Sequence, residues 1–308
     1  MKKILITGGT GTVGKSFIKE YYDEYEFYSI SRNEASISEL KRLYPKVNCY
    51  VGNICDLDHM INLFCTISPD IVIHTAALKH INLAEENPTS AVEINVVGSS
   101  NIAKASIRAA VPLTVGVSTD KACNPDSVYG YSKKMMETMF MQYNNKTTRF
   151  ICTRFANVAN SSGSVIPFWK REAAKGNALK LTHPDMNRLM FSKTDSARLI
   201  KHAMHCSETY ENSFVLCQSM KNVNLLKLAK IISDKEVEII GKRPGEKLNE
   251  TLISEKELPY TRYTFGHQYI MITPELQDHF DTLSKECSSM TADNMSSDEM
   301  KLLIKDDE

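Results

Sequence analysis

Residues 4–16, ILITGGTGTVGKS, constrain the fold of this chain more than any other part of its sequence. An apolar run leads into a glycine-rich turn and then into a helical pattern, the arrangement that binds phosphate at the end of a strand. Two known patterns overlap in this segment. Residues 9–16 match the GxxxxGKS of a P-loop, which binds nucleoside triphosphates, and residues 8–14 match the GxxGxxG of a dinucleotide-binding turn.

Short apolar runs alternate with amphipathic helical patterns through the first half of the chain, which is typical of a parallel sheet covered by helices on both faces. We therefore expect an α/β fold, with a Rossmann-type, doubly wound parallel sheet over residues 1–165 to which later segments return. The predicted strands are KKILITG, EFYSIS, VNCYVG, DIVIHTA, LTVGVST and RFICTRF. The predicted helices are residues 12–25, 35–43, 57–67, 87–110 and 127–145.

The pattern becomes less regular after this domain. We expect residues 166–280 to form mainly a smaller, substrate-binding lobe. Within it, residues 236–253, EVEIIGKRPGEKLNETLI, predict a strand, a turn and a helix. Residues 281–308 are polar and end in Asp306, Asp307 and Glu308, so we expect a loosely held polar tail.

Charge and composition exclude several classes of partner. Lysine plus arginine and aspartate plus glutamate number 37 each, so no net charge draws the chain to nucleic acid or to an anionic membrane. No apolar run approaches the roughly 20 residues that span a bilayer. The eight cysteines form no CxxC pair and several lie in apolar runs, which is typical of reduced thiols in a cytoplasmic protein. We expect no nucleic-acid partner, no membrane partner and no metal site.

The residue after the second strand of a dinucleotide-binding domain contacts the ribose of the adenosine. Ser31 and Arg32 stand at this point, in FYSISRN. An acidic residue would favour the free 2′-hydroxyl of NAD, whereas the guanidinium of Arg32 favours the 2′-phosphate of NADP. We therefore predict NADP as the cofactor, with NAD as the poorer fit.

The segment STDKACNPDSVYGYSKK, residues 118–134, bears on both readings of the glycine turn. Asp120 follows an apolar strand and would hold the magnesium that a P-loop needs. Tyr129 and Lys133 are four residues apart on a predicted helix and share a face. The lysine ammonium and the charge of a nicotinamide both favour a phenolate, so we expect the pKa of Tyr129 to be drawn from about 10 towards neutrality. Tyr129 would then be a base for a sugar or alcohol hydroxyl.

Taken together, TGGTGTVGKSF, HTAALKHINLAEENP, EINVVGSSNI, STDKACNP, YGYSKK, TRFANVANSSGSVIPFW and GKRPGEKLNE resemble the extended short-chain dehydrogenase/reductase superfamily. Within it, the match is closest to the inverting UDP-N-acetylglucosamine 4,6-dehydratases of polysaccharide biosynthesis, and it covers residues 6–250. The resemblance implies bound NADP, a UDP-sugar substrate and a homo-oligomer. It also implies that Lys15 and Ser16 are ordinary helix residues and that the P-loop match is accidental.

The resemblance assigns the chemistry to a few residues. Tyr129 would take the proton from the sugar's 4-hydroxyl while hydride leaves C4, with Thr119 bonded to that oxygen and Lys133 holding the cofactor's ribose. Water would then be eliminated across C5 and C6, with Lys121 as the base at C5 and Asp120 as the acid at the 6-hydroxyl. Because lysine must be neutral to act as a base, we expect the pKa of Lys121 to be depressed.

The resemblance also implies which residues bind the two ligands. Asn53 departs from the aspartate that is usual in the family at the adenine, but its side-chain oxygen still accepts a hydrogen bond. The cofactor residues would be Gly8, Thr10, Gly11, Thr12, Val13, Gly14, Ser31, Arg32, Asn53, Ile54, Ala76, Ala77, Lys79, Asn95, Tyr129 and Lys133. The nucleotide-sugar residues would be Lys79, His80, Asn157, Ser164, Val165, Glu246 and, for the diphosphate, Arg188 and Arg243.

Two alternatives stay open from the sequence. A nucleotide-sugar 4-epimerase, or another nucleotide-sugar dehydratase, would share the glycine turn and the tyrosine–lysine pair, although an epimerase does not need Asp120 and Lys121. A non-catalytic NADP-binding sensor or scaffold protein is the other alternative. Such proteins commonly lose the tyrosine or the lysine, and this chain has both.

Overall fold

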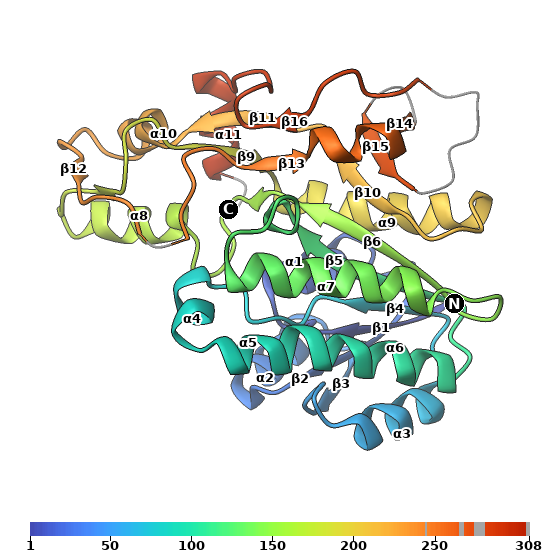
Figure 1. The fold of residues 1–308 in the computed structure, drawn as a ribbon. Helices are drawn as coiled ribbons and strands as arrows, with labels where there is room; N and C mark the ends of the chain where they lie inside the picture. Colours follow the sequence, from blue (N-terminus) through green and yellow to red (C-terminus); the bar gives the residue numbers. More distant parts are fainter. Residues whose placement is uncertain (244, 265–267, 274–280, 306–308) are drawn as a thin grey trace.

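The computed structural model describes residues 1–243, 245–264, 268–273 and 281–305 (Figure 1). Within these residues nine strands form one sheet, in the order β14-β15-β10-β6-β5-β4-β1-β2-β3. The strands from β6 to β3 in this order are all parallel, which confirms the expected Rossmann-type α/β fold. They are β1 (Lys3–Thr7), β2 (Glu26–Ser31), β3 (Asn48–Val51), β4 (Ile71–His74), β5 (Leu113–Thr119) and β6 (Arg149–Phe155).

Alternate residues of β1 explain why helices cover both faces of this sheet. Ile4 and Ile6 belong to the same apolar cluster as Phe17 of α1, whereas Leu5 between them belongs to the cluster that contains Phe64 of α3. Helices α3, α6 and α7 lie side by side, and α1 packs against α9 (Figure 1). These helices and α2 are α1 (Thr12–Glu20), α2 (Glu34–Leu43), α3 (Leu57–Ile67), α6 (Gly98–Arg108), α7 (Val128–Tyr143) and α9 (Lys193–Thr209).

Two predicted helices differ from the structure in their extent. The first ends at Glu20 rather than at residue 25, and the rings of Tyr21 and Tyr25 beyond it pack on Phe17. The helix predicted over residues 87–110 is present without a break from Pro88 to Arg108 but contains a π-helical turn: it follows α4 (Ile81–Glu86) and consists of α5 (Pro88–Val92), η1 (Glu93–Val97) and α6. No helix in the described part of the chain is both long and apolar enough to cross a lipid bilayer.

Later segments extend the sheet and build a second lobe, drawn from yellow-green to red in Figure 1. β10 pairs in parallel with β6, and β15 and β14 follow it antiparallel. The second lobe packs its helices around Trp169 and Leu228. Its elements, with the three added strands, are β7 (Asn157–Val158), α8 (Val165–Ala174), β8 (Lys180–Leu181), β9 (Asn187–Phe191), β10 (Val215–Gln218), β11 (Lys221–Asn224), α10 (Leu225–Ile232), β12 (Glu238–Ile239), β14 (Thr261–Thr264) and β15 (Tyr269–Ile272).

The expectation of a loosely held tail is wrong for residues 281–305. β16 (Cys287–Ser288) pairs with β13 (Thr251–Ile253), and Met300 and Leu303 of α11 (Ser297–Lys305) are buried in the core of the second lobe. Met300 and Leu303 are three residues apart and share one face of α11, so they anchor this otherwise polar segment in the core. Residues 306–308, the acidic end, lie outside the described residues.

The segment predicted as strand, turn and helix over residues 236–253 also differs. It contains β12 and a long connection, and it ends in the strand β13 rather than in a helix. Leu252 and Ile253 are buried, and β13 gains its hydrogen-bonding partner from β16, which lies far along the chain. Local sequence does not show this partner, so the pattern alone could not distinguish a strand from a helix here.

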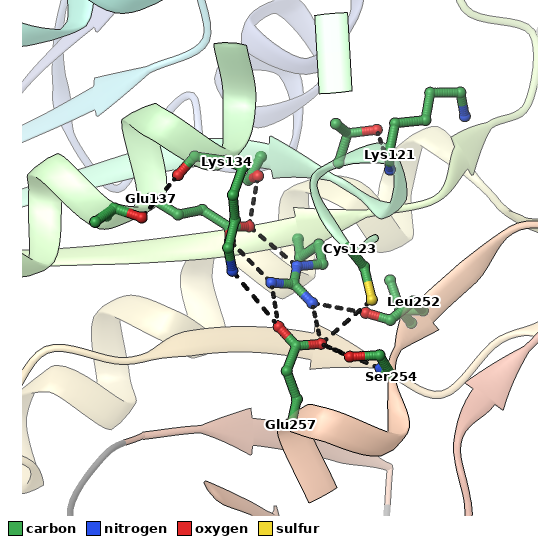
Figure 2. Close-up of polar contacts among 11 residues, drawn as sticks. Lys121, Cys123, Lys134, Glu137, Leu252, Ser254 and Glu257 are labelled. Carbon is green, nitrogen blue, oxygen red and sulfur yellow. Dashed lines mark hydrogen bonds and ion pairs between the residues drawn. The ribbon is translucent and has the colours of Figure 1, made fainter. Parts of the chain in front are cut away.

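A buried ion cluster ties this segment to the Rossmann domain (Figure 2). Arg154 of β6 is 1% exposed and forms a two-bond fork with Glu137 of α7, at 2.8 and 3.0 Å. It forms a second fork with Glu257 of the 3-10 helix η3 (Glu255–Tyr260), at 2.9 and 3.0 Å. Its remaining N–H donates to the carbonyl of Leu252 at 2.8 Å. The guanidinium thus uses all five of its N–H groups on protein acceptors.

We expect Arg154→Met to lower the free energy of unfolding by about 3–5 kcal/mol, because it leaves two carboxylates, one of them fully buried, without their cation. Lys134 is the matched control: it contacts Glu137 at 3.5 Å and Glu257 at 3.7 Å, but its side chain is 43% exposed. Lys134→Met should lower the free energy by less than about 1 kcal/mol. Urea denaturation of both variants measures the two values, and equal values would contradict the assignment.

Candidate functional site

A cleft of about 660 Å³ lies over the carboxyl ends of the parallel strands, where open α/β sheets bind ligands. The glycine turn between β1 and α1 forms one part of it, and the segments after the other five parallel strands form most of the rest. The second lobe contributes residues 157–164. Both ligand types expected from the sequence, a dinucleotide and a sugar nucleotide, would therefore share one cleft.

Close packing explains why the turn after β1 needs glycine. Gly8 has a φ of 74°, in the left-handed region, and a Cβ there would lie 2.9 Å from the backbone of Ala76. A Cβ at Gly14 would lie 2.6 Å from the Cα of Gly9. The amide of Gly11 donates to the carbonyl of Gly8 at 2.9 Å and closes the turn. The chain can therefore approach a phosphate closely before α1 begins.

The P-loop alternative does not fit the side chains that follow the turn. Lys15 Nζ lies 3.2 Å from Glu39 Oε1 of α2, and Ser16 Oγ donates to the carbonyl of Thr12 at 2.8 Å. In a P-loop these two side chains would face the terminal phosphates and magnesium. Here both are engaged within the helical layer, so the geometry favours the dinucleotide reading.

Most residues predicted to bind the cofactor line the cleft, but two do not. Asn95 is buried in η1, where its side chain bonds both backbone groups of Leu78 at 2.7 and 3.0 Å and Ser132 Oγ at 2.9 Å. Asn95 therefore supports the cleft wall and does not line the cleft. Gly14 lets the start of α1 lie against the glycine turn, because a Cβ there would meet the backbone of Gly9. The predicted residues that do line the cleft are Gly8, Thr10, Gly11, Thr12, Val13, Ser31, Arg32, Asn53, Ile54, Ala76, Ala77, Lys79, Tyr129 and Lys133.

A loop of the second lobe closes over the glycine turn. The amide of Ser162 donates to Thr12 Oγ1 at 3.0 Å, and Lys79 Nζ donates to the carbonyl of Ser162 at 2.7 Å. The next residue, Gly163, has a φ of 75° and lies so close to His80 that a Cβ would be 2.6 Å from the ring. Lys79 and His80 therefore hold this loop, and both still line the cleft.

The 3-10 turn η2 (Asp120–Ala122) follows β5 and carries the predicted proton-transfer pair. Asp120 Oδ1 accepts from Thr119 Oγ1 at 2.9 Å and from Lys121 Nζ at 3.0 Å. Asp120 is 1% exposed, and its Oδ2 has no hydrogen-bond partner among the described residues. Thr119 and Lys121 line the cleft, so an open acceptor lies directly behind its wall.

The expected depression of the pKa of Lys121 is wrong. Glu250, which the sequence analysis did not single out, places its Oε1 3.5 Å from Lys121 Nζ. Burial lowers the pKa of Lys121, but the charges of Asp120 and Glu250 outweigh burial and hold the pKa above its usual value. Lys121 is therefore an ammonium in the protein itself, because two carboxylates rather than one surround it.

The expected shift of Tyr129 also differs in the protein itself. Burial raises the pKa of Tyr129 to about 12, although Lys121 and Thr119 favour the phenolate. The cation that lowers it is thus Lys121 rather than Lys133. Lys133 is 2% exposed, donates to Met136 Sδ at 3.0 Å, and has a pKa that burial lowers to about 8. Tyr129, Lys133, Thr119 and Lys121 nevertheless line one cleft.

The predicted sugar-nucleotide residues divide into two groups. Asn157 and Ser164 line the cleft with Lys79 and His80. The described residues that line it do not include Val165, which begins α8, or Arg188, Arg243 and Glu246.

Arg188 is not free to bind a diphosphate. It is 7% exposed and donates to the carbonyls of Asn187, Lys247 and Leu248 at 2.7–3.1 Å. Its assignment to the diphosphate therefore does not hold in this structure, because the guanidinium is used to hold the connection that leads to β13.

Sequence reasoning missed Glu250 and Ser162. Glu250 ends the segment GKRPGEKLNE. Leu248, Glu250 and Leu252 are two residues apart, which is the spacing of side chains on one face of a strand, so the sequence did indicate a strand here. That signal was lost because the segment was predicted to be helical. Ser162 acts through its backbone, which no side-chain pattern reveals.

Comparison with known proteins agrees with this geometry. The family model described as "Polysaccharide biosynthesis protein" matches residues 4–273. An uncharacterized membrane protein of Methanocaldococcus jannaschii is 35% identical over 277 residues, 83% of this chain and 82% of that protein. A protein of Campylobacter jejuni named UDP-N-acetylglucosamine 4,6-dehydratase (inverting) is 36% identical over 291 residues, 90% of this chain and 84% of that protein.

Among solved structures, Pen from Bacillus thuringiensis has a TM-score of 0.90 and 26% sequence identity, and the match covers 99% of this chain and 97% of that one. The similarity therefore extends through both lobes, including the segment after residue 281. With a Rossmann-type sheet, a dinucleotide turn, a Tyr129-x3-Lys133 helix and a family match over most of its length, this chain belongs to the polysaccharide biosynthesis protein family.

Proposed function

We propose that this protein is a UDP-N-acetylglucosamine 4,6-dehydratase that inverts C5, with NADP as its bound cofactor. The product would be a UDP-2-acetamido-2,6-dideoxy-hexos-4-ulose. The observation that carries the proposal is that Lys121 and Tyr129 line one cleft behind a dinucleotide turn, with Asp120 bonded to Lys121 directly behind the cleft wall. The Campylobacter jejuni relative, by its name, supports the same activity.

The first step needs a group that removes the proton from the sugar's 4-hydroxyl. We assign this role to Tyr129, whose phenol must first lose its own proton: burial raises its pKa to about 12, and Lys121 and Thr119 favour the phenolate against burial. Lys133, four residues further along α7, lines the same cleft and would hold the cofactor's ribose. NADP, when bound, supplies the hydride acceptor at C4 and the hydride donor at C6.

The elimination needs a base at C5 and an acid at the 6-hydroxyl. We assign these roles to Lys121 and Asp120, respectively. The resting pair is an ammonium and a carboxylate 3.0 Å apart, so one proton must pass from Lys121 Nζ to Asp120 Oδ1 before either can act. That single transfer produces both the neutral amine and the carboxylic acid that the elimination requires. After hydride returns to C6, inversion needs a further proton, which would come from solvent to the opposite face of C5.

Turnover of UDP-N-acetylglucosamine in deuterated water tests the reaction. We expect a product that lacks one water and carries deuterium at C5 of an L-configured ring, by mass spectrometry and NMR. Tyr129→Phe should lower the rate about 10²–10⁴-fold, because the phenol performs acid–base chemistry. Tyr131→Phe, which changes an exposed ring two residues away, is the matched control. A product of unchanged mass would instead identify an epimerase, and no turnover with NADP bound would favour a sensor.

We propose NADP rather than NAD because of Arg32, which lines the cleft immediately after β2 beside Ser31. Charge-assisted bonds to a 2′-phosphate are worth about 1.5–3 kcal/mol, so Arg32→Ala should weaken NADP binding at least about tenfold and leave NAD binding unchanged. Arg42→Ala, on the exposed side of α2 away from this cleft, should change neither. Calorimetric titration with both cofactors gives the ratio, and an equal loss for both would contradict the assignment.

We also propose that the protein is a homo-oligomer. Val92, Val97, Tyr131 and Met135 are exposed on α5, η1 and α7, and these elements contact one another. Neighbouring apolar side chains on a surface are typical of a protein interface. Light scattering after size-exclusion chromatography should give a multiple of the 34.7 kDa chain mass, and a mass of one chain would contradict the proposal.

A further inference from the structure

Glu250 occupies a place that neither the family resemblance nor the cleft itself assigns. It is 5% exposed, directly before β13, and it is absent from the described residues that line the cleft. Ser289 holds its backbone on both sides: the Ser289 amide donates to the carbonyl of Glu250 at 2.9 Å, and the Glu250 amide donates to Ser289 Oγ at 3.1 Å. The segment after residue 281 thus fixes the position of this carboxylate.

The carboxylate completes a row of charges at the cleft wall. Lys121 Nζ lies between Asp120 Oδ1 at 3.0 Å and Glu250 Oε1 at 3.5 Å. The other charges that act on Glu250 are Arg188 of β9 and Lys247 of the preceding connection, and Arg188 also acts on Lys121. On the side of α7, the titratable group that faces Lys121 is Tyr129, and the charge of Lys121 lowers the pKa of this tyrosine.

A purely structural role does not explain this arrangement. β13 is already held by its pairing with β16 and by the bond from Arg154 to Leu252. An apolar side chain at position 250 would generally stabilise a buried site as well as an ion pair does. The carboxylate is instead directed at Lys121, the member of the row that lines the cleft.

We propose that Glu250 is a positioning residue: its carboxylate holds the ammonium of Lys121 against Asp120 and thereby sets where, and in which protonation state, Lys121 meets the sugar. This inference rests on the proposed function for its role in catalysis, but not for its effect on Lys121. A lysine side chain has a flexible four-carbon stem, and a second carboxylate restricts it to one place. The same carboxylate makes loss of the proton from Nζ harder, because it stabilises the charged form.

Competitive labelling of lysine amines with acetic anhydride tests this effect without any substrate. Only the neutral amine reacts, so peptide mass spectrometry across a pH series gives the titration midpoint of Lys121. Glu250→Gln keeps size and hydrogen-bonding capacity but removes the charge, and it should lower the midpoint by about one pH unit or more. Glu250→Asp keeps the charge but withdraws it by one methylene, and should give a smaller shift in the same direction. Glu255→Gln, which changes an exposed glutamate of η3, is the control and should give none.

The kinetic arm uses the intact enzyme with its bound cofactor and UDP-N-acetylglucosamine. Because the elimination needs the one proton that Lys121 and Asp120 share, the basic limb of the pH profile of kcat, where that proton is lost, should move to lower pH in Glu250→Gln by the same amount as the labelling midpoint. KM should stay within twofold, since Glu250 lies outside the cleft lining. Glu250→Asp should again lie between the wild type and Glu250→Gln, so the order of the three proteins is itself a test.

Two results would overturn the inference. One is a labelling midpoint for Lys121 that is the same in the wild type and in Glu250→Gln. The other is a loss of activity that appears only in KM or in thermal stability, with an unchanged pH profile. If the wild type releases no dehydrated product, the proposed function fails, and the labelling midpoint still decides whether Glu250 controls Lys121. If Glu250→Gln does not fold, the shift in Glu250→Asp decides it.

Discussion

Arg154 joins parts of the chain that the sequence keeps far apart, and the site depends on that junction. Its guanidinium binds Glu137 of α7, Glu257 of η3 and the carbonyl of Leu252 in β13. Helix α7 carries Tyr129 and Lys133, and β13 follows Glu250 directly. Burial of an unpaired charge costs several kcal/mol, so removal of any one partner would destabilise the others. One buried cation therefore couples the helix that carries Tyr129 to the segment that carries Glu250.

The turn η2 is held at both of its ends: Figure 2 shows the contact of Cys123 with the ion cluster, and Lys121 is held by Asp120 and Glu250. Cys123 Sγ donates to Glu257 Oε2 at 3.2 Å on the side of the ion cluster, and Lys121 points away from that cluster. Asp120 and Glu250 then receive the ammonium of Lys121. A turn that holds Lys121 between two carboxylates would suit the proposed elimination, because its acid and base are then held at set positions relative to the sugar.

The two lobes together close the end of the cleft that contains the glycine turn. The Rossmann domain supplies the glycine turn, and the second lobe supplies the loop whose Ser162 bonds Thr12 and Lys79. A cofactor that accepts hydride in one step and returns it in a later one must stay bound through the whole reaction. A loop bonded across the turn would slow the release of a cofactor beneath it, as the proposed dehydratase requires.

The sequence by itself determined the Rossmann sheet, the dinucleotide turn and the residues of η2 and α7. Each depends on neighbours within a few positions: short apolar runs that form buried strands, a glycine where no Cβ fits, and Tyr129 and Lys133 on one helix face. Only the tertiary structure decided that residues 281–305 are packed, that Arg188 is bound to backbone carbonyls, and that Lys121 is an ammonium. These properties depend on partners as distant in sequence as Lys121 and Glu250. Charge and burial at such a site are sums over groups that meet only after the chain has folded, so no local pattern contains them.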